Sequence, residues 1–459
     1  MARSPRAAVG LLILALGILS APLDTAVNIA FPSITEAFRL NVQDIRWIVI
    51  AYVLTYASLM LVFGRLGDLM GYRPLFQLGL LVNAAGLVAC ATAQSYTLLL
   101  LGRMVQGVGI ALTLSCAPAL AISLYEERDR VRVLGIYAAI HAAGSAFGPL
   151  VGGYLVDCCA WPAVFWARVP LVLAALALSW RLRTAPVGGS IGTFDAPGAA
   201  LLVTWMSALL LALSITTEPF GRAVGGALLV LALLTFAAFL ICEARRTHPL
   251  IRLALFRDAR FTAMNLASVA VNLTAFGVLL LVPYYLLRVA RLDTGVGGIV
   301  LACGAGGTVV GAWLAGRLAA HVRTGRLALA GIFLGIAGLW AISTWTPATP
   351  LTTVALALVL HGLGLRLFQV AYTDLVIASL PSADRGVAGS LTILTRTVGV
   401  VGGASALSAA FQYFELRAQR AGAPAAAAFL DGFQATFGYA AAALALCLAI
   451  SLLRPRLWA

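Results

Sequence analysis

Long uninterrupted apolar runs are the feature that most restricts the fold of this chain. Several reach the ~20 residues that an α-helix needs to cross the hydrocarbon of a bilayer, and 62% of the 459 residues are hydrophobic. The runs lack the strict alternation of apolar and polar residues that marks the strands of a membrane barrel. Because a helix satisfies its own backbone hydrogen bonds in lipid, the sequence predicts an all-α polytopic membrane protein.

The apolar runs predict fourteen membrane-spanning helices. The first begins after a short basic stretch that resembles a signal peptide, but its apolar character continues past Asp24, so we expect it to be retained. The expected spans are residues 8–30, 46–63, 75–93, 97–122, 133–156, 163–180, 196–215, 223–242, 262–287, 296–316, 327–345, 351–379, 387–411 and 433–453.

The positions of the basic residues predict the orientation of the chain. All 31 are arginine, and the net charge is +14. If both termini are cytoplasmic, the inner segments carry most of the arginines, as the positive-inside rule requires. The charge therefore reflects topology and predicts no nucleic-acid partner. We expect a multi-pass protein of the plasma membrane, with both termini in the cytoplasm, that functions as a monomer in the lipid bilayer.

Two similar segments indicate an internal duplication. GRLGDLMGYR (Gly64–Arg73) follows the second span, and the looser copy GRLAAHVRTGR (residues 316–326) follows the tenth, roughly 250 residues later. Two six-helix halves would place the copies six spans apart, so two further helices must be inserted between them. The predicted organisation is a six-helix half at residues 1–185, a linker and two inserted helices at 186–245, and a second six-helix half at 246–459.

The residue types exclude several activities. Without lysine the chain cannot contain the phosphate-binding loop G-x-x-x-x-G-K-[ST], so ATP hydrolysis is not expected. No cluster has the spacing of metal ligands. We therefore expect no enzyme activity, no cofactor and no metal, and transport energy must come from an ion gradient.

The segment GRLGDLMGYR combines glycines with opposite charges at the cytoplasmic boundary. Glycine permits a tight loop, and Asp68 and Arg73 supply the charges. An ordinary glycine-rich loop that follows the positive-inside rule remains an alternative. The pattern resembles the signature G-x-L-x-D-x-x-G-x-[RK] of the major facilitator superfamily, whose fold contains two six-helix halves.

That resemblance implies a conformational latch. The aspartate of the loop is expected to dock on the N-terminal end of the helix that begins the thirteenth span, and to separate from it when the cavity opens inward. The second copy lacks the aspartate, so the latch would be one-sided. The latch residues in this chain would be Gly64, Asp68, Gly71, Arg73 and Gly386.

The fifth span contains GSAFGPLVGG, in which three glycines recur every four residues. Small residues at this spacing allow helices to approach closely in lipid, and proline can bend the helix. We expect this face to pack against Gly304, Gly307 and Gly311 of the tenth span. A packing role alone is the alternative, but the whole motif resembles one associated with antiporters of the superfamily, which implies export. Its residues are Gly144, Gly148, Pro149, Gly152 and Gly153.

The first and fourth spans carry the candidate proton-coupling residues. PLDTAVNIAFP (Pro22–Pro32) resembles the LD-x-T-x-VN-x-A-x-P element of the fourteen-helix drug:proton antiporter branch, although Asp24 stands one residue nearer Asn28 than is usual. RMVQGVGIA, from Arg103, resembles an R-x-x-x-G motif of proton-coupled exporters. Asp24 and Arg103 each lie about 9 Å below the expected outer end of their span. We expect them to form a coupling pair, or alternatively a permanent ion pair between helices.

Polar residues inside the spans predict a substrate cavity. A buried arginine normally faces a partner or a watery cavity, and four arginines lie within spans against two aspartates. A net positive cavity favours neutral, zwitterionic or anionic substrates over permanent cations. Arg366 and Asp374 are about 12 Å apart along their helix, too far for a direct pair. The candidate cavity residues are Asn28, Gln106, Arg366, Gln369, Asp374 and Arg396.

These observations predict a proton-coupled secondary antiporter. It would export a hydrophobic small molecule, such as a drug or antibiotic, by alternating access. A flippase of the same fold, acting on lipids or lipid-linked intermediates, is the alternative. Substrate transport driven by a pH gradient would favour the first function, and lipid reorientation alone would favour the second.

Overall fold

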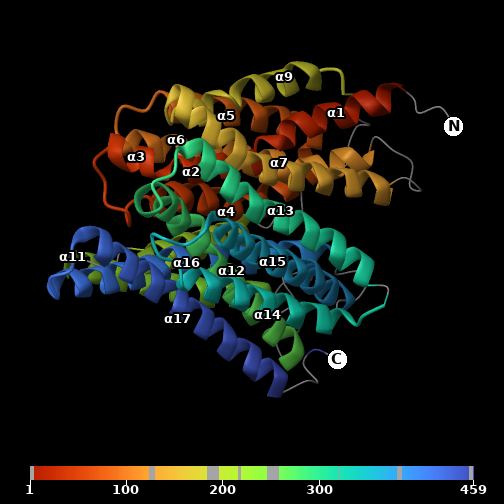
Figure 1. Ribbon diagram of the computed structural model, residues 1–459. Coiled ribbons are helices and arrows are strands. Elements are labelled where there is room, and N and C mark those ends of the chain that lie inside the picture. Colours follow the sequence, from red (N-terminus) through yellow and green to blue (C-terminus); the bar gives the residue numbers. More distant parts are fainter. Residues whose placement is uncertain are drawn as a thin grey trace. The chain divides into compact units, whose positions relative to one another are not determined.

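The computed structural model describes residues 5–123, 130–182, 196–214, 219–244, 258–319, 321–379, 385–453 and 458. Within these ranges the chain is almost entirely helical and contains no strand (Figure 1). It divides into two compact units, Met1–Val203 and Thr204–Ala459. The all-α class predicted from the apolar runs is confirmed.

The first unit is built around α6, which packs against α4 and α5. On the other side of the unit, α1 packs against α6 and α9, and α7 packs against η1 and α2. Its elements are α1 (Pro5–Leu19), η1 (Pro22–Thr25), α2 (Ala26–Ile29), α3 (Phe31–Ala37), α4 (Arg46–Met70), α5 (Tyr72–Ala91), α6 (Tyr96–Ser123), α7 (Arg130–Cys159), α8 (Ala163–Trp166) and α9 (Val169–Ser179).

Two of the expected spans are broken at prolines. The first is not one helix over residues 8–30, because α1 ends at Leu19 and Pro22 begins the 3-10 turn η1. The sixth is divided between α8 and α9, with Pro170 in the first turn of α9. Proline has no backbone N–H to donate and its ring clashes with the preceding helical turn. The two breaks carry Asp24 and Arg168.

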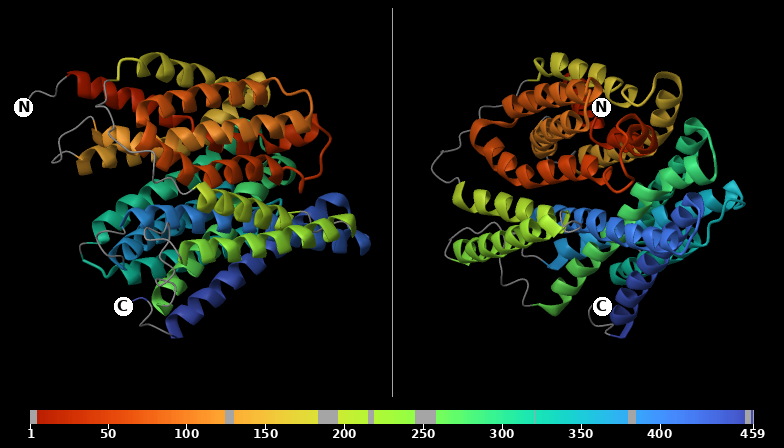
Figure 2. Two further views of the ribbon diagram at one scale, coloured as in Figure 1. Left: turned by 180° about the vertical axis from the view of Figure 1, so that it is seen from behind. Right: turned by 90° about the vertical axis from the view of Figure 1, so that its left-hand side faces the viewer.

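The second unit is arranged around α15 and α16. The helix α15 packs against both α13 and α14, and α16 packs against α12 and α17 (Figure 2). The elements are α11 (Pro219–Ala244), α12 (Ala259–Tyr284), the π-helical turn η5 (Tyr285–Val289), α13 (Thr294–Leu318), α14 (Thr324–Ser343), α15 (Leu351–Ser379), α16 (Arg385–Arg420) and α17 (Ala425–Leu453).

The helix α10 (Ala196–Ser214) contains the boundary between the two units, which falls after Val203. It runs beside α11 (Figure 2), and Trp205 stacks on Phe236 with ring centroids 4.7 Å apart. These two helices cover the residues predicted to form the inserted pair, and their insertion between two six-helix halves stays a prediction. The part of the predicted linker before α10, residues 186–195, lies outside the described residues, as does the segment at residues 245–257.

Length and apolar composition confirm a membrane protein. Ten helices of the described part are long and apolar enough to cross a bilayer. Three shorter apolar helices, Arg46–Met60, Ala163–Ser179 and Ala200–Leu209, accompany them. The chain is therefore a multi-pass membrane protein.

Candidate functional site

Asp24 lies in the break of the first span. It belongs to η1, and its side chain is only 13% exposed. A carboxylate at such a position in a membrane protein needs a counter-charge or hydrogen-bond donors. The structure provides two arginines.

Arg103 of α6 forms a two-pronged ion pair with Asp24. Its Nη1 lies 2.7 Å from Oδ1, and its Nη2 lies 2.7 Å from Oδ2. Paired hydrogen bonds of this kind combine geometric specificity with the strength of a charge-assisted contact. The contact predicted from the equal depth of the two residues is confirmed, whereas their role in proton coupling stays a prediction.

Arg168 is a second cation on the same carboxylate. It lies between α8 and α9, is 2% exposed, and places Nη1 2.6 Å from Oδ1 of Asp24. Its Nε donates to the carbonyl of Val164, and within the described residues its Nη2 has no hydrogen-bond partner. The sequence placed Arg168 inside a span but did not identify Asp24 as its partner.

Further contacts fix Arg103 in place. Gln106 is fully buried, accepts a hydrogen bond from Arg103 at 2.7 Å and donates one to Asp24 at 3.3 Å. The Nε of Arg103 donates to the carbonyl of Ile48, and the guanidinium lies 4.2 Å from the ring centroid of Tyr52. With two arginines and one aspartate, the ion cluster Asp24–Arg103–Arg168 carries one net positive charge and links the first, fourth and sixth predicted spans.

The glycines of α7 face the segment that carries Asp24. A Cβ on Gly148 would overlap the hydroxyl of Thr25, and one on Gly152 would lie 2.7 Å from the carbonyl oxygen of Ala26. The Thr25 hydroxyl also donates to the carbonyl of Ser145 at 3.2 Å. Close approach at this face therefore seats η1 and α2 against α7. Gly144, Pro149 and Gly153 of the same motif are buried too.

The prediction that these glycines pack against the tenth span is wrong. A Cβ on Gly304, Gly307 or Gly311 would meet α15, which belongs to the same unit as α13. Each set of glycines is thus covered by elements of its own unit. The glycine spacing correctly identified a close-packed face but carried no information about the neighbouring element.

The prediction of a loop from Gly64 to Arg73 is also wrong. The helix α4 continues to Met70, because no residue after Gly64 prevents a helical conformation, and only Gly71 interrupts it. Gly71 has a φ of 91°, which favours glycine. Arg73 then donates from Nη2 to the carbonyl of Trp180, just after α9, at 3.0 Å.

Two residues of the predicted latch are described only by their backbone. Asp68 lies in the last turn of α4, and its side chain is outside the described part. Gly386 is the second residue of α16, so the thirteenth predicted span begins where the motif requires a helix end. The latch itself stays a prediction.

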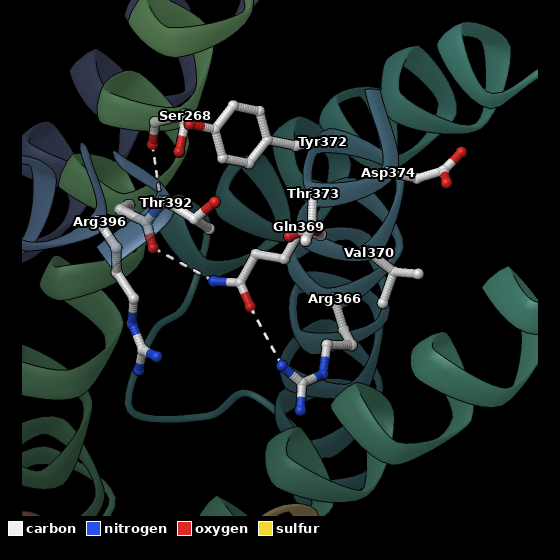
Figure 3. Close-up of a pocket in the computed structure, with 10 residues that line it drawn as sticks. Ser268, Arg366, Gln369, Val370, Tyr372, Thr373, Asp374, Thr392 and Arg396 are labelled. Atoms are coloured by element: carbon white, nitrogen blue, oxygen red, sulfur yellow. Dashed lines mark hydrogen bonds between the residues drawn. The ribbon is translucent and has the colours of Figure 1, made fainter. Parts of the chain in front are cut away.

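A pocket of about 400 Å³, lined mostly by polar residues, lies in the second unit between α12, α15 and α16 (Figure 3). This volume is within the range of sites for small organic ligands. Its lining includes four of the predicted cavity residues, namely Arg366, Gln369, Asp374 and Arg396. The lining residues are Ser268, Asn272, Arg366, Gln369, Val370, Tyr372, Thr373, Asp374, Thr392 and Arg396.

A chain of hydrogen bonds crosses this pocket. Arg366 donates from Nη1 to Oε1 of Gln369 at 3.4 Å, and Gln369 donates from Nε2 to Oδ1 of Asn272 at 3.2 Å (Figure 3). Asn272 donates in turn to the carbonyl of Ser268 at 2.8 Å. These hydrogen bonds fix the orientation of the side-chain amides of Gln369 and Asn272. The contact from Arg366 is the longest of the three.

The charged residues at the pocket do not pair with one another. Asp374 accepts a hydrogen bond from the Thr324 hydroxyl at 3.0 Å and points away from Arg366 and Arg396 (Figure 3). Arg396 is exposed and makes no ion pair with any described residue. The absence of an Arg366–Asp374 pair agrees with their separation along α15.

The other two predicted cavity residues, Asn28 and Gln106, lie in the first unit and do not line this pocket. Gln106 belongs to the ion cluster, and Asn28 is buried in α2. The sequence analysis missed Ser268 and Asn272. These two are four residues apart in the mostly apolar helix α12, a spacing that places polar groups on one face and could have identified them.

Residues 13–404 match the model of the Major Facilitator Superfamily. The chain belongs to the Major Facilitator Superfamily. It is a membrane transporter and not an enzyme, as the residue types predicted.

Several relatives within the superfamily are named for resistance to antibiotics. The tetracenomycin C resistance and export protein of Streptomyces glaucescens is 32% identical over 85% of this chain and 73% of its own length. A methylenomycin A resistance protein of Streptomyces coelicolor is 30% identical over 86% and 83% of the two chains. The riboflavin transporter RibZ of Clostridioides difficile is 27% identical over 87% of each.

Solved structures share the superfamily fold. The inward-facing bacterial homologue of the human lysosomal transporter Spinster has a TM-score of 0.72 over 100% of this chain and 98% of its own, at 18% identity. At that identity the likeness concerns the fold alone. It supports the all-α superfamily fold predicted from the apolar runs and the GRLGDLMGYR motif, whereas the fourteen-helix organisation stays a prediction.

Proposed function

We propose that this superfamily member is a proton-coupled antiporter that exports hydrophobic small molecules by alternating access. The observation that carries the proposal is the similarity, over most of the chain, to proteins named for antibiotic resistance and export. The buried pair of Asp24 and Arg103 supports proton coupling, because it places a titratable acid beside a buried cation within the helical bundle.

The proposed coupling step is the exchange of a proton for an arginine at Asp24. A guanidinium beside the carboxylate favours its charged form, whereas burial without a partner favours the protonated form. Since Arg103 and Arg168 both contact Asp24, proton uptake requires both to withdraw. The transition between inward-open and outward-open states, or the arrival of substrate, would supply that movement.

The proposed conformational latch lies at the cytoplasmic end of α4. Asp68 would interact with the helix end near Gly386 and release it when the cavity opens inward. The helical end of α4, the turn at Gly71 and the contact of Arg73 with Trp180 would hold Asp68 at a fixed position.

We further propose the topology of the fourteen-helix branch. Residues 1–185 and 246–459 would form the two six-helix halves, and residues 186–245 would carry the linker and the inserted pair α10 and α11. The arginine distribution supports a plasma-membrane protein with both termini in the cytoplasm. We propose that one chain suffices for transport.

The test of this function uses cells that lack their other drug pumps. Expression of the protein should lower the amount of neutral or acidic aromatic antibiotic that accumulates inside these cells. A protonophore, which collapses the proton gradient, should raise that amount again. An unchanged effect after the proton gradient has collapsed would contradict proton coupling. Stronger protection against ethidium-like cations than against neutral or acidic compounds would contradict the predicted positive cavity.

A further inference from the structure

We propose that the pocket of the second unit binds an aryl carboxylate through Arg366 and Arg396. The inference rests on the proposed export function and narrows its substrates to organic acids with an apolar aromatic body. Three features of the pocket support the inference: its positive charges that are unpaired among the described residues, its occupied hydrogen-bond acceptors and its volume.

The first argument is an uncompensated positive charge. Arg366 of α15 and Arg396 of α16 both line the pocket, and neither pairs with a carboxylate among the described residues. Asp374, the acid at the edge, is bound to Thr324 and turned away (Figure 3). Two like charges at one pocket repel each other, and an anion between them would remove that repulsion.

The second argument is that the nearby amide oxygens already accept hydrogen bonds. Oε1 of Gln369 accepts from Arg366, and Oδ1 of Asn272 accepts from Gln369. The hydroxyl of Thr373 donates to the backbone carbonyl of Gln369. Arg396 makes no hydrogen bond to another residue that lines the pocket, so its donors are available to a guest (Figure 3). The guest must therefore supply acceptors, and a carboxylate presents two oxygens that match the fork of a guanidinium.

The third argument is the space beside the arginines. The cavity of about 400 Å³ exceeds the volume of a carboxylate group alone. Val370 and the ring of Tyr372 are part of its lining (Figure 3). The phenol of Tyr372 donates a hydrogen bond to Asn265 and its ring stacks on Phe368, so the ring is held in place. Tyr372 is only 1% exposed, so an aromatic guest would contact just the small part of the ring that lines the pocket.

Equilibrium binding to the purified full-length protein in detergent tests the proposal. The probes are anthraquinone-2-carboxylate and 2-naphthoate, each compared with its uncharged carboxamide of the same shape. We expect each acid to bind about tenfold more tightly than its amide, the effect of one charge-assisted contact. Arg366→Gln and Arg396→Gln should each remove most of this preference, and Arg366→Lys should keep part of it.

The matched control is Arg420→Gln, which removes an exposed arginine at the end of α16 and should leave the preference unchanged. Equal affinity for acids and amides, no binding of either acid, or a preference that survives in both glutamine variants overturns the proposal. Binding is measured without a proton gradient. Failure of export in a protein that prefers the acids would therefore contradict only the proposed function.

Discussion

Arg168 and Arg103 share one oxygen of Asp24, with Nη1 of each arginine within 2.7 Å of Oδ1. Through this shared oxygen, Arg168, which lies between α8 and α9, contacts the ion pair that Asp24 of η1 forms with Arg103 of α6. It also means that Asp24 keeps one cation when the other moves away. The stability of the first unit and the proposed coupling of transport to protons would therefore depend on the same three side chains.

Stability should change in a definite order when this ion cluster is altered. Asp24→Asn leaves two buried arginines without an acid and should cost roughly 3–5 kcal/mol of unfolding free energy. Arg168→Asn keeps the two-pronged pair and should cost less. The double variant Asp24→Asn/Arg168→Asn has one buried positive charge fewer than Asp24→Asn, so this variant should be more stable than Asp24→Asn alone. Thermal unfolding in detergent measures the order, and additive losses from the two changes would contradict it.

Gly148→Leu should displace the segment that carries Asp24. The new side chain would overlap Thr25, and overpacking of this kind typically costs about 1–3 kcal/mol. We expect a lower Tm and a large loss of transport. The control is Gly226→Leu, because a Cβ at Gly226 has no neighbour within 4 Å. Normal transport by Gly148→Leu would show that close approach at this face is not required.

Asp68→Asn should lower the transport rate while the protein still inserts and folds. The change removes the charge that a helix N-terminus favours by about 0.3–2 kcal/mol. Transport and surface expression should be measured together, beside the exposed control Glu36→Gln. Wild-type turnover in Asp68→Asn would count against the latch.

The sequence predicted the helices and the charged residues within them better than it predicted which elements and side chains they contact. The apolar runs located the ten long apolar helices and three shorter ones of the described part, while the count of fourteen spans stays a prediction. The equal depth of Asp24 and Arg103 in their spans correctly predicted their contact. The second partner, Arg168, depends on the break before Pro170, whose effect on side-chain direction is set by packing in three dimensions. A residue's position along its helix sets the face it lies on but not the element that covers that face, and Asp374 accepts its hydrogen bond from Thr324.

The central claim is that a proton gradient drives export through Asp24. Its most direct test is transport in proteoliposomes under an imposed pH gradient, with the compound against which the protein best protects cells. The wild type and Glu36→Gln should accumulate this compound against its own gradient, whereas Asp24→Asn should bind the compound without accumulating it. Accumulation by Asp24→Asn at the wild-type level, or a wild-type rate that is the same with and without the pH gradient, would contradict the claim.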